Sequence, residues 1–147
     1  MSQLPRFSGQ ICLVIVIASL LATLTSCGSH EPIDLQPVKF DDTQTYCKIS
    51  GPALIVRIQN LGHDFSVDTN TEVVFNTASS PTSIHLKSPT GTIPPGEYAN
   101  VLFTLLHNKT NGYETPVGKV TITADADDNQ PETNKGNNTV SGTCGSE

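Results

Sequence analysis

The sequence is poor in the residues on which many binding surfaces depend. Its 147 residues include no Trp, one Met, 5% aromatic residues, and 8 Lys or Arg against 14 Asp or Glu. This shortage of basic residues argues against nucleic acid as a partner and against electrostatic adhesion to anionic lipid. Most of the few aromatic residues are needed for the core of one small domain, so an aromatic-lined sugar site is not expected.

Recognisable catalytic patterns are also missing. There is no Gly-x-Ser-x-Gly turn and no Gly-rich phosphate loop. The histidines are far apart and show no HxH, HExxH or HxxE spacing that would indicate a metal: His30, His63, His85 and His107. The sequence does not decide whether the fold brings a Ser, a His and an Asp together. We expect a protein that is not an enzyme and that carries no cofactor.

Helical periodicity is absent, whereas strand periodicity recurs. Ten Pro, 11 Gly and many β-branched residues interrupt every candidate helical stripe. In Ala53–Asn60, by contrast, Leu54, Val56 and Ile58 share one face while Arg57 and Gln59 lie on the other. The same alternation places further groups on one face each: Thr71, Val73 and Phe75; Ile84 and Leu86; Val101, Phe103 and Leu105; Val120, Ile122 and Ala124.

Turn residues separate these segments. They are Asn60-Leu61-Gly62, Ser79-Ser80-Pro81, Ile93-Pro94-Pro95-Gly96, Asn111-Gly112 and the polar stretch 125–138. Together with Leu35–Phe40 at the front and Asn138–Cys144 at the back, the pattern predicts an all-β fold. It is typical of an antiparallel β-sandwich of about seven short strands.

The start of the chain has the features of an export signal. Arg6 precedes an uncharged apolar run, Ile11–Leu24, that is shorter than the roughly 20 residues of a membrane span. The following Leu24-Thr25-Ser26-Cys27 is similar to a lipoprotein cleavage site, in which the cysteine receives diacylglycerol. We therefore predict a signal peptide at 1–26, lipidation of Cys27, a tether at 27–32 and one domain at 33–147. A chance cysteine after an ordinary signal peptide is the alternative, and an uncleaved anchor is disfavoured because no basic cluster follows.

This organisation predicts a location in the cell envelope, with the domain lipid-anchored and facing the periplasm or the exterior. Gly28 stands where some lipoproteins have an Asp that retains them in an inner membrane, so the outer membrane is expected in a Gram-negative host. Cys12 leaves with the signal, and Cys47 and Cys144 remain as an even pair in an oxidising compartment. We expect a disulfide between them; two free thiols or a metal pair are the alternatives.

The acidic stretch after residue 124 is a weak calcium candidate. Asp125, Asp127 and Asn129 alternate as in the first half of an EF-hand loop. The second half departs from that pattern, because the sixth position is Gln130 and the twelfth is Gly136. A polar turn in which Asp and Asn side chains bond nearby backbone amides is the favoured interpretation. A calcium contact of another geometry would use Asp125, Asp127, Asp128 or Glu132.

Several of these motifs occur in an order that resembles the bacterial CARDB (cell adhesion related) family. They are the opening Pro32-Ile33-Asp34-Leu35, Val56–Gly62 with its Asn-x-Gly turn, Ile93–Glu97, the strand Gly118–Ala124 and the loop Asp125–Asn138. Two positions depart from the family: Gln130 replaces a usual apolar residue, and Lys135 replaces a frequent Glu. The resemblance implies an immunoglobulin-like sandwich of about seven strands that serves as a non-catalytic surface or spacer module.

Three functions remain from the sequence. The first is a membrane-anchored interaction or adhesion module whose partner is a protein or a surface polymer. The second is an accessory envelope lipoprotein that inhibits or assembles another protein, which a protruding segment at Leu106–Pro116 would favour. The third is a calcium-dependent binding protein based on residues 125–132. Exposed edge strands are the expected contact surface, and polar loops at one end of the sandwich are the competing choice.

Overall fold

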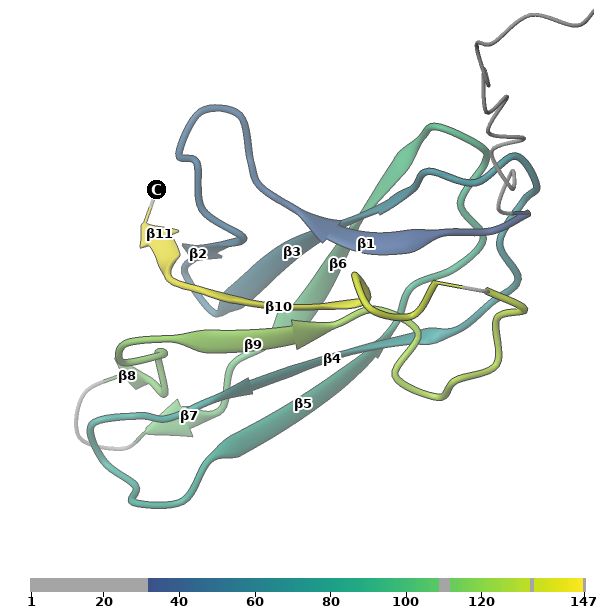
Figure 1. Cartoon of the computed structure of the whole chain (residues 1–147). Helices are drawn as coiled ribbons and strands as arrows, with labels where there is room; N and C mark the ends of the chain where they lie inside the picture. Colours follow the sequence, from purple (N-terminus) through teal and green to yellow (C-terminus); the bar gives the residue numbers. More distant parts are fainter. Residues whose placement is uncertain (1–31, 109–111, 133, 147) are drawn as a thin grey trace, which may run out of the picture.

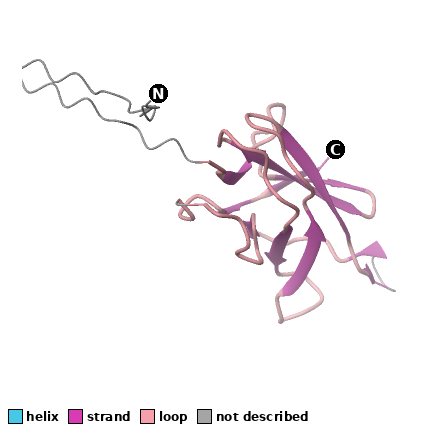
Figure 2. Cartoon of the chain, turned by 90° about the vertical axis from the view of Figure 1, so that its right-hand side faces the viewer, coloured by secondary structure: helices cyan, strands magenta, loops and turns pink. Residues whose placement is uncertain are grey.

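The computed structural model describes residues 32–108, 112–132 and 134–146. The predicted signal peptide, the lipidation site Cys27 and most of the tether lie outside the described residues. The described part of the chain consists of strands, turns and loops (Figure 2). A helix with the length and apolarity needed to cross a membrane does not occur within it.

The strands form two main sheets and a small hairpin (Figure 1). Sheet A contains β1, β2, β3, β6 and β11, and sheet B has the order β10-β9-β4-β5. β7 and β8 pair only with each other in the described chain. The strand bounds are β1 Leu35–Val38, β2 Cys47–Ser50, β3 Ala53–Asn60, β4 Asn70–Phe75, β5 Ile84–Pro89, β6 Tyr98–Thr104, β7 His107–Asn108, β8 Gly112–Tyr113, β9 Val120–Thr123, β10 Thr139–Gly142 and β11 Cys144–Ser146.

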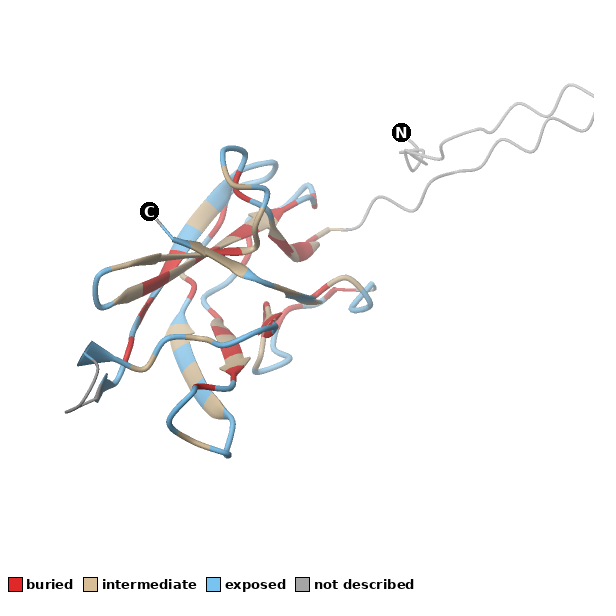
Figure 3. Ribbon diagram, turned by 90° about the vertical axis from the view of Figure 1, so that its left-hand side faces the viewer, coloured by how far each residue is buried: buried red, intermediate tan, exposed pale blue. Residues whose placement is uncertain are grey.

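The core lies between the two sheets and follows the predicted alternation. Leu54, Val56 and Ile58 of β3 are fully buried, as are Val73 of β4 and Ile122 of β9. Buried positions alternate with more exposed ones along these strands (Figure 3). An extended chain points successive side chains to opposite sides, so one face of each strand fills the space between the sheets. The predicted core positions on β3, β4, β6 and β9 are confirmed.

Two strands of the sandwich are interrupted. β1 pairs with residues 57–60 of β3 and β2 with residues 53–56, so both lie along the same side of β3, and both are antiparallel to it. At the other end of the chain, β10 pairs with β9 in sheet B, whereas β11 pairs in parallel with β2 in sheet A. Only Thr143 separates β10 from β11. With each interrupted pair taken as one strand, the sandwich has seven strands, which confirms the predicted immunoglobulin-like fold.

The disulfide joins the two interrupted strands. Cys47 and Cys144 are opposite each other in the parallel pair β2–β11, with their Cα atoms 4.5 Å apart and a bond between their sulfurs. The predicted disulfide is confirmed. It does not bring the two ends of the domain together, since the described chain begins at the opposite end of β1 from β11 (Figure 1).

The sandwich therefore has two distinct ends. The near end, where the described chain begins, carries the loops 61–69, 90–97 and 124–138; backbone hydrogen bonds join Pro32 to the first loop and Ser66 to Ile93. The far end carries the turns 51–52 and 76–83 and the β7–β8 hairpin. Leu105 donates to the Pro52 carbonyl and Val117 to that of Asn76 at this end. Part of the segment Leu106–Pro116, expected as a loop, forms this hairpin.

Candidate functional site

The near end is organised around the Asn-x-Gly turn that follows β3. Asn60 is fully buried, and its Nδ2 donates to the carbonyl oxygens of Asp64 at 2.8 Å and Ile93 at 3.0 Å. Its Oδ1 accepts a hydrogen bond from Gly62 N at 2.9 Å. One amide therefore links the loop 61–69 to the loop 90–97, which explains an Asn at the end of β3.

Gly62 is required because the first residues of the domain cross directly over it. A Cβ atom at this position would lie 2.6 Å from Ile33 Cα and 2.6 Å from the Pro32 carbonyl oxygen. The Pro32 oxygen also accepts hydrogen bonds from His63 N at 3.0 Å and Asp64 N at 2.7 Å. The start of the domain is thus held against the loop 61–69 by backbone contacts that a side chain would prevent.

Asp125, the first calcium candidate, organises the acidic loop. The residue is 5% exposed, and its carboxylate accepts hydrogen bonds from Thr69 Oγ1 at 2.6 Å and from the backbone nitrogens of Asn129 and Gln130, both at 3.1 Å. Its backbone has a φ of 46°, a conformation that Asp tolerates better than most residues. The favoured interpretation of a polar turn with side-chain to backbone hydrogen bonds describes this geometry.

Gln130 links the acidic loop to the loop 61–69. Its side-chain Oε1 accepts from Val67 N at 3.1 Å, and its Nε2 donates to Val67 O at 2.8 Å. Gln130 is only 3% exposed. These two hydrogen bonds explain why Gln130 stands where the family usually has an apolar residue. Its side-chain amide bonds the Val67 backbone as a neighbouring strand would.

Glu132 connects the same loop to β1 and to the start of the last strand. Its Oε1 accepts from Leu35 N at 2.6 Å, and its Oε2 accepts from Asn138 Nδ2. Burial of the carboxyl raises the pKa of Glu132, and the two hydrogen bonds oppose that shift. Next to it, Asn137 Nδ2 donates to Asp34 Oδ1 at 2.7 Å. The paired Asn motif thus fastens the acidic loop to the beginning of the domain.

The remaining two calcium candidates form ion pairs. Lys87 Nζ contacts Asp127 Oδ1 at 2.6 Å, and Lys135 Nζ contacts Asp128 Oδ1. The hydrogen bond from Lys87 lowers the pKa of Asp127. Asp128 accepts its hydrogen bond from Lys135, which stands where the family often has Glu. The four candidate carboxylates therefore point to different protein donors. Among the described residues, no group of three His, Cys, Asp or Glu side chains is arranged to hold a metal ion.

The described histidines also lie apart. His85 Nδ1 on β5 is 3.2 Å from Glu72 Oε1 on β4, and the ring of His107 on β7 packs edge-on against Tyr113 at 5.5 Å between centroids. His63 belongs to the near end, where its backbone bonds Pro32. His30 lies outside the described residues. The described histidines are thus on separate elements.

The outer face of sheet A carries a stacked cation that the sequence alone did not indicate. The Arg57 guanidinium lies 4.7 Å from the ring centroid of Phe40 and 4.1 Å from that of Tyr98. Its Nε donates to Asn100 Oδ1 at 3.3 Å. The alternation on β3 correctly placed Arg57 on the outer face, but the two rings reach it from a loop and from β6.

The prediction that most aromatic residues serve the core is only partly right. Phe40, Phe75 and Phe103 are buried. Three other aromatic side chains are exposed: Phe65 by 63%, Tyr98 by 51% and Tyr113 by 40%. The Tyr98 ring packs against the Arg57 guanidinium and the Tyr113 ring against His107. Phe65 belongs to the loop 61–69.

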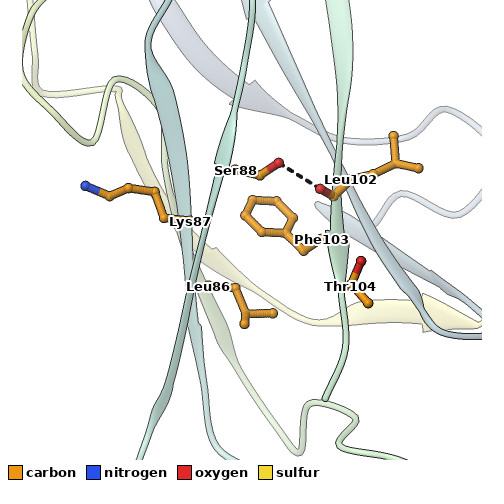
Figure 4. A pocket seen from close by; sticks show the side chains of 6 residues that line it. All are labelled: Leu86, Lys87, Ser88, Leu102, Phe103 and Thr104. Carbon is orange, nitrogen blue, oxygen red and sulfur yellow. Dashed lines mark hydrogen bonds between the residues drawn. The ribbon is translucent and has the colours of Figure 1, made fainter. Parts of the chain in front are cut away.

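The two sheets adjoin along one side without backbone pairing. Within the described chain, β5 pairs only with β4 and β6 only with β3, and Ser88 Oγ donates to Leu102 O at 2.8 Å across the gap. A groove of about 300 Å³ lies here between the strands. Leu86 and Phe103 point into it, whereas Lys87 and Leu102 point away (Figure 4). The predicted exposed edge strands are therefore present and adjacent.

Fold and surface together define an immunoglobulin-like β-sandwich with an open edge groove and a loop-rich near end. The chain belongs to the CARDB family, which matches residues 34–142 and thus the whole span from the start of β1 to β10. The resemblance read from the sequence is confirmed. CARDB domains are typically adhesion-related modules of the cell exterior or envelope. The comparisons with curated proteins and with solved structures gave no match.

Proposed function

We propose that this protein is a non-catalytic interaction module, anchored in the cell envelope by lipid on Cys27, that binds an extended segment of a partner protein. Family membership supports an envelope module, and the sequence Leu24-Thr25-Ser26-Cys27 supports the anchor. A disulfide between Cys47 and Cys144 suits an oxidising compartment. The acidic balance argues against nucleic acid as the partner.

The observation that carries the proposal is the groove between β5 and β6. Edge strands present backbone donors and acceptors that can pair with an added strand. Leu86 and the buried Phe103 lie at the base of the groove, whose exposed lining is mainly polar, and Leu102 is 58% exposed beside it. An extended segment with apolar residues at alternate positions would satisfy both features.

An accessory role as an inhibitor or assembly factor is the second candidate. Leu106 and Val117 flank the β7–β8 hairpin at the far end, and both are 55% exposed. Apolar side chains around a hairpin can enter a depression on another protein. In that case the contact would lie at the far end, away from the groove.

The test is site-specific photocrosslinking in the native cell. A crosslinker at Leu102 is expected to capture a polypeptide, whereas one at Val117 is not; the reverse result would favour the accessory role. Ser88→Lys should abolish the Leu102 crosslink because it places a charge at the groove. Ser141→Lys on β10, the other edge of sheet B, is the matched control and should leave it intact.

Intact mass of the membrane-extracted protein tests the anchor separately. The expected mass is that of a chain beginning at Cys27 with acyl chains attached. A chain that begins elsewhere or lacks acyl chains would overturn the anchored part of the proposal and leave the groove as an independent question.

A further inference from the structure

The near end of the domain carries exposed apolar side chains beside the point where the chain enters the fold. Leu61, Phe65 and Val67 are exposed by 46%, 63% and 52%. All three belong to the loop 61–69, and this loop binds the Pro32 carbonyl through His63 N and Asp64 N. The apolar side chains therefore lie close to the last residue of the predicted tether.

The fold holds these side chains in an outward position. Ser66, between Phe65 and Val67, is 2% exposed, and its Oγ accepts a hydrogen bond from Ile93 N at 2.7 Å. The Val67 backbone is bound on both its N–H and C=O by Gln130. Ser66 is thus directed inward, whereas Phe65 and Val67 on either side of it are exposed.

The position of Cys27 limits which part of the domain can meet the membrane. Pro32 is five positions after Cys27, so at about 3.4 Å per position the near end lies within about 17 Å of the lipid attachment. The far end is farther by about the length of β3, whose eight residues span about 26 Å. The apolar loop is thus on the end that a short tether would hold at the bilayer.

We propose that the near end rests on the membrane, with Leu61, Phe65 and Val67 inserted at the boundary between headgroups and acyl chains of a zwitterionic bilayer. This inference rests on the proposed lipid anchor and adds an orientation to it. The far end would then point away from the membrane, and the groove on the side of the sandwich would run between the two ends. A partner can reach both.

The charge of the near end selects the kind of lipid. Asp64 and Asp68 are exposed in the same loop, and residues 61–69 contain no Lys or Arg. Asp128 in the neighbouring acidic loop is also exposed, but it pairs with Lys135, so the repulsion comes from Asp64 and Asp68. Anionic headgroups would repel these carboxylates, so the contact must be apolar and largely insensitive to salt.

The absence of Trp from the chain allows a clean fluorescence test. Phe65→Trp and Leu106→Trp place single reporters on exposed residues of the near and far ends, 63% and 55% exposed in the wild type. Each acylated full-length protein is reconstituted in phosphatidylcholine vesicles with brominated acyl chains. We expect a blue shift and at least twofold quenching for the Phe65→Trp reporter, and neither for the Leu106→Trp reporter, at low and at high salt alike.

Four other results would overturn the inference, and they are distinguishable from one another. Equal quenching of both reporters, in a protein that floats with the vesicles, removes the orientation but keeps the anchor. A blue shift at Phe65→Trp without quenching shows that a second copy or another protein covers the loop. Quenching that high salt abolishes shows an electrostatic contact. A protein that is unacylated and does not float overturns both this inference and the anchor. Unchanged thermal unfolding of both variants verifies that they are folded.

Discussion

At the scale of single residues, polar and small side chains of the near end decide how the loops are held. Asn60, Asp125, Gln130 and Glu132 are almost fully buried. The first, third and fourth each bond the backbone of a distant segment, whereas Asp125 bonds the Thr69 hydroxyl and the backbone of its own loop. Such groups cost free energy if left without a partner, so their hydrogen bonds specify one loop arrangement. These hydrogen bonds give the near-end motifs a structural role.

Gly62→Ala tests the close approach of the first residues. The added methyl would overlap the Ile33 and Pro32 backbone, and we expect a loss of about 2 to 3 kcal/mol in the free energy of unfolding, measured with urea. Gly136→Ala is the matched control, since its nearest neighbour is the Asn134 side chain at 3.3 Å. A loss of equal size in both variants would contradict the assigned role.

The pKa of Glu132 predicts an unusual pH dependence. Because burial raises this pKa in the folded state, the folded protein binds a proton more strongly than the unfolded chain does, and the contribution of Glu132 to stability rises as the pH falls towards 4.5. The variant Glu132→Gln cannot titrate. It keeps the hydrogen bonds to Leu35 N and to the Asn138 side chain if the Asn138 amide rotates. The stability of the wild type relative to this variant should therefore increase between pH 7.5 and pH 4.5 in urea unfolding. A relative decrease would show that the carboxylate form is favoured by folding.

Calcium provides a test of the acidic loop. Because Asp125 bonds three groups and Asp127 and Asp128 pair with lysines, a cation would have to displace these partners. We expect millimolar calcium to leave the thermal unfolding temperature unchanged relative to magnesium. A calcium-specific increase, lost in Asp127→Asn, would instead support the calcium-dependent alternative.

At the scale of elements, the strands follow their local patterns, whereas their partners come from distant parts of the chain. β2 has only four residues, and it becomes a strand because β3 and β11 pair with it on its two sides. The loop 61–69 has no strand, yet Gln130 pairs with its backbone in the manner of a strand. Edge pairing and loop pairing are thus the interactions that the alternation pattern does not specify.

Gln130→Leu restores the residue type that the family usually has, and here we expect it to destabilise the protein. It would leave the N–H and C=O of Val67 without their buried partner, at a cost of about 2 to 3 kcal/mol in urea unfolding. Gln59→Leu makes the same change on β3, where the amide donates to Gly96 O at 3.2 Å near solvent, and should cost less than about 1 kcal/mol. A stabilising Gln130→Leu would refute the pairing role.

At the scale of the whole molecule, the disulfide and the short tether give the domain its polarity. The Cys47–Cys144 disulfide joins two residues that are 97 positions apart in the sequence. It lies in sheet A, far from the start of the described chain. The near end is organised by polar contacts, and the far end carries the hairpin. The groove between β5 and β6 runs along the side of the sandwich, between these two ends.

Removal of the disulfide should destabilise the whole sandwich. In the chain-entropy model a closed loop of this length contributes on the order of 4 to 5 kcal/mol. We expect the double variant Cys47→Ser, Cys144→Ser to unfold at lower urea concentration than the oxidised wild type. Reduced wild type should unfold with the double variant, and a reductant should leave the double variant unchanged. Equal stability of oxidised and reduced wild type would contradict the prediction.

The all-β class, the core positions and the cysteine pair follow from local patterns in the sequence. Alternation with a period of two is a property of a single strand, so Leu54, Val56 and Ile58 could be assigned to one face without knowledge of any partner. The family motifs were also readable, because their turn residues act within a few positions, as Asn60 does on Gly62. Two cysteines, Cys47 and Cys144, follow residue 27, so a single pairing had to be considered.

The division of the last strand between two sheets and the groups that the carboxylates bind depend on tertiary contacts. The hydrogen bond from Leu35 N to Glu132 spans 97 positions, and those between Gln130 and Val67 span 63. The exposure of Phe65 and the edge groove likewise depend on which segments cover which surfaces. Contacts of this kind arise from packing between segments far apart in the chain, and a local pattern carries no information about them.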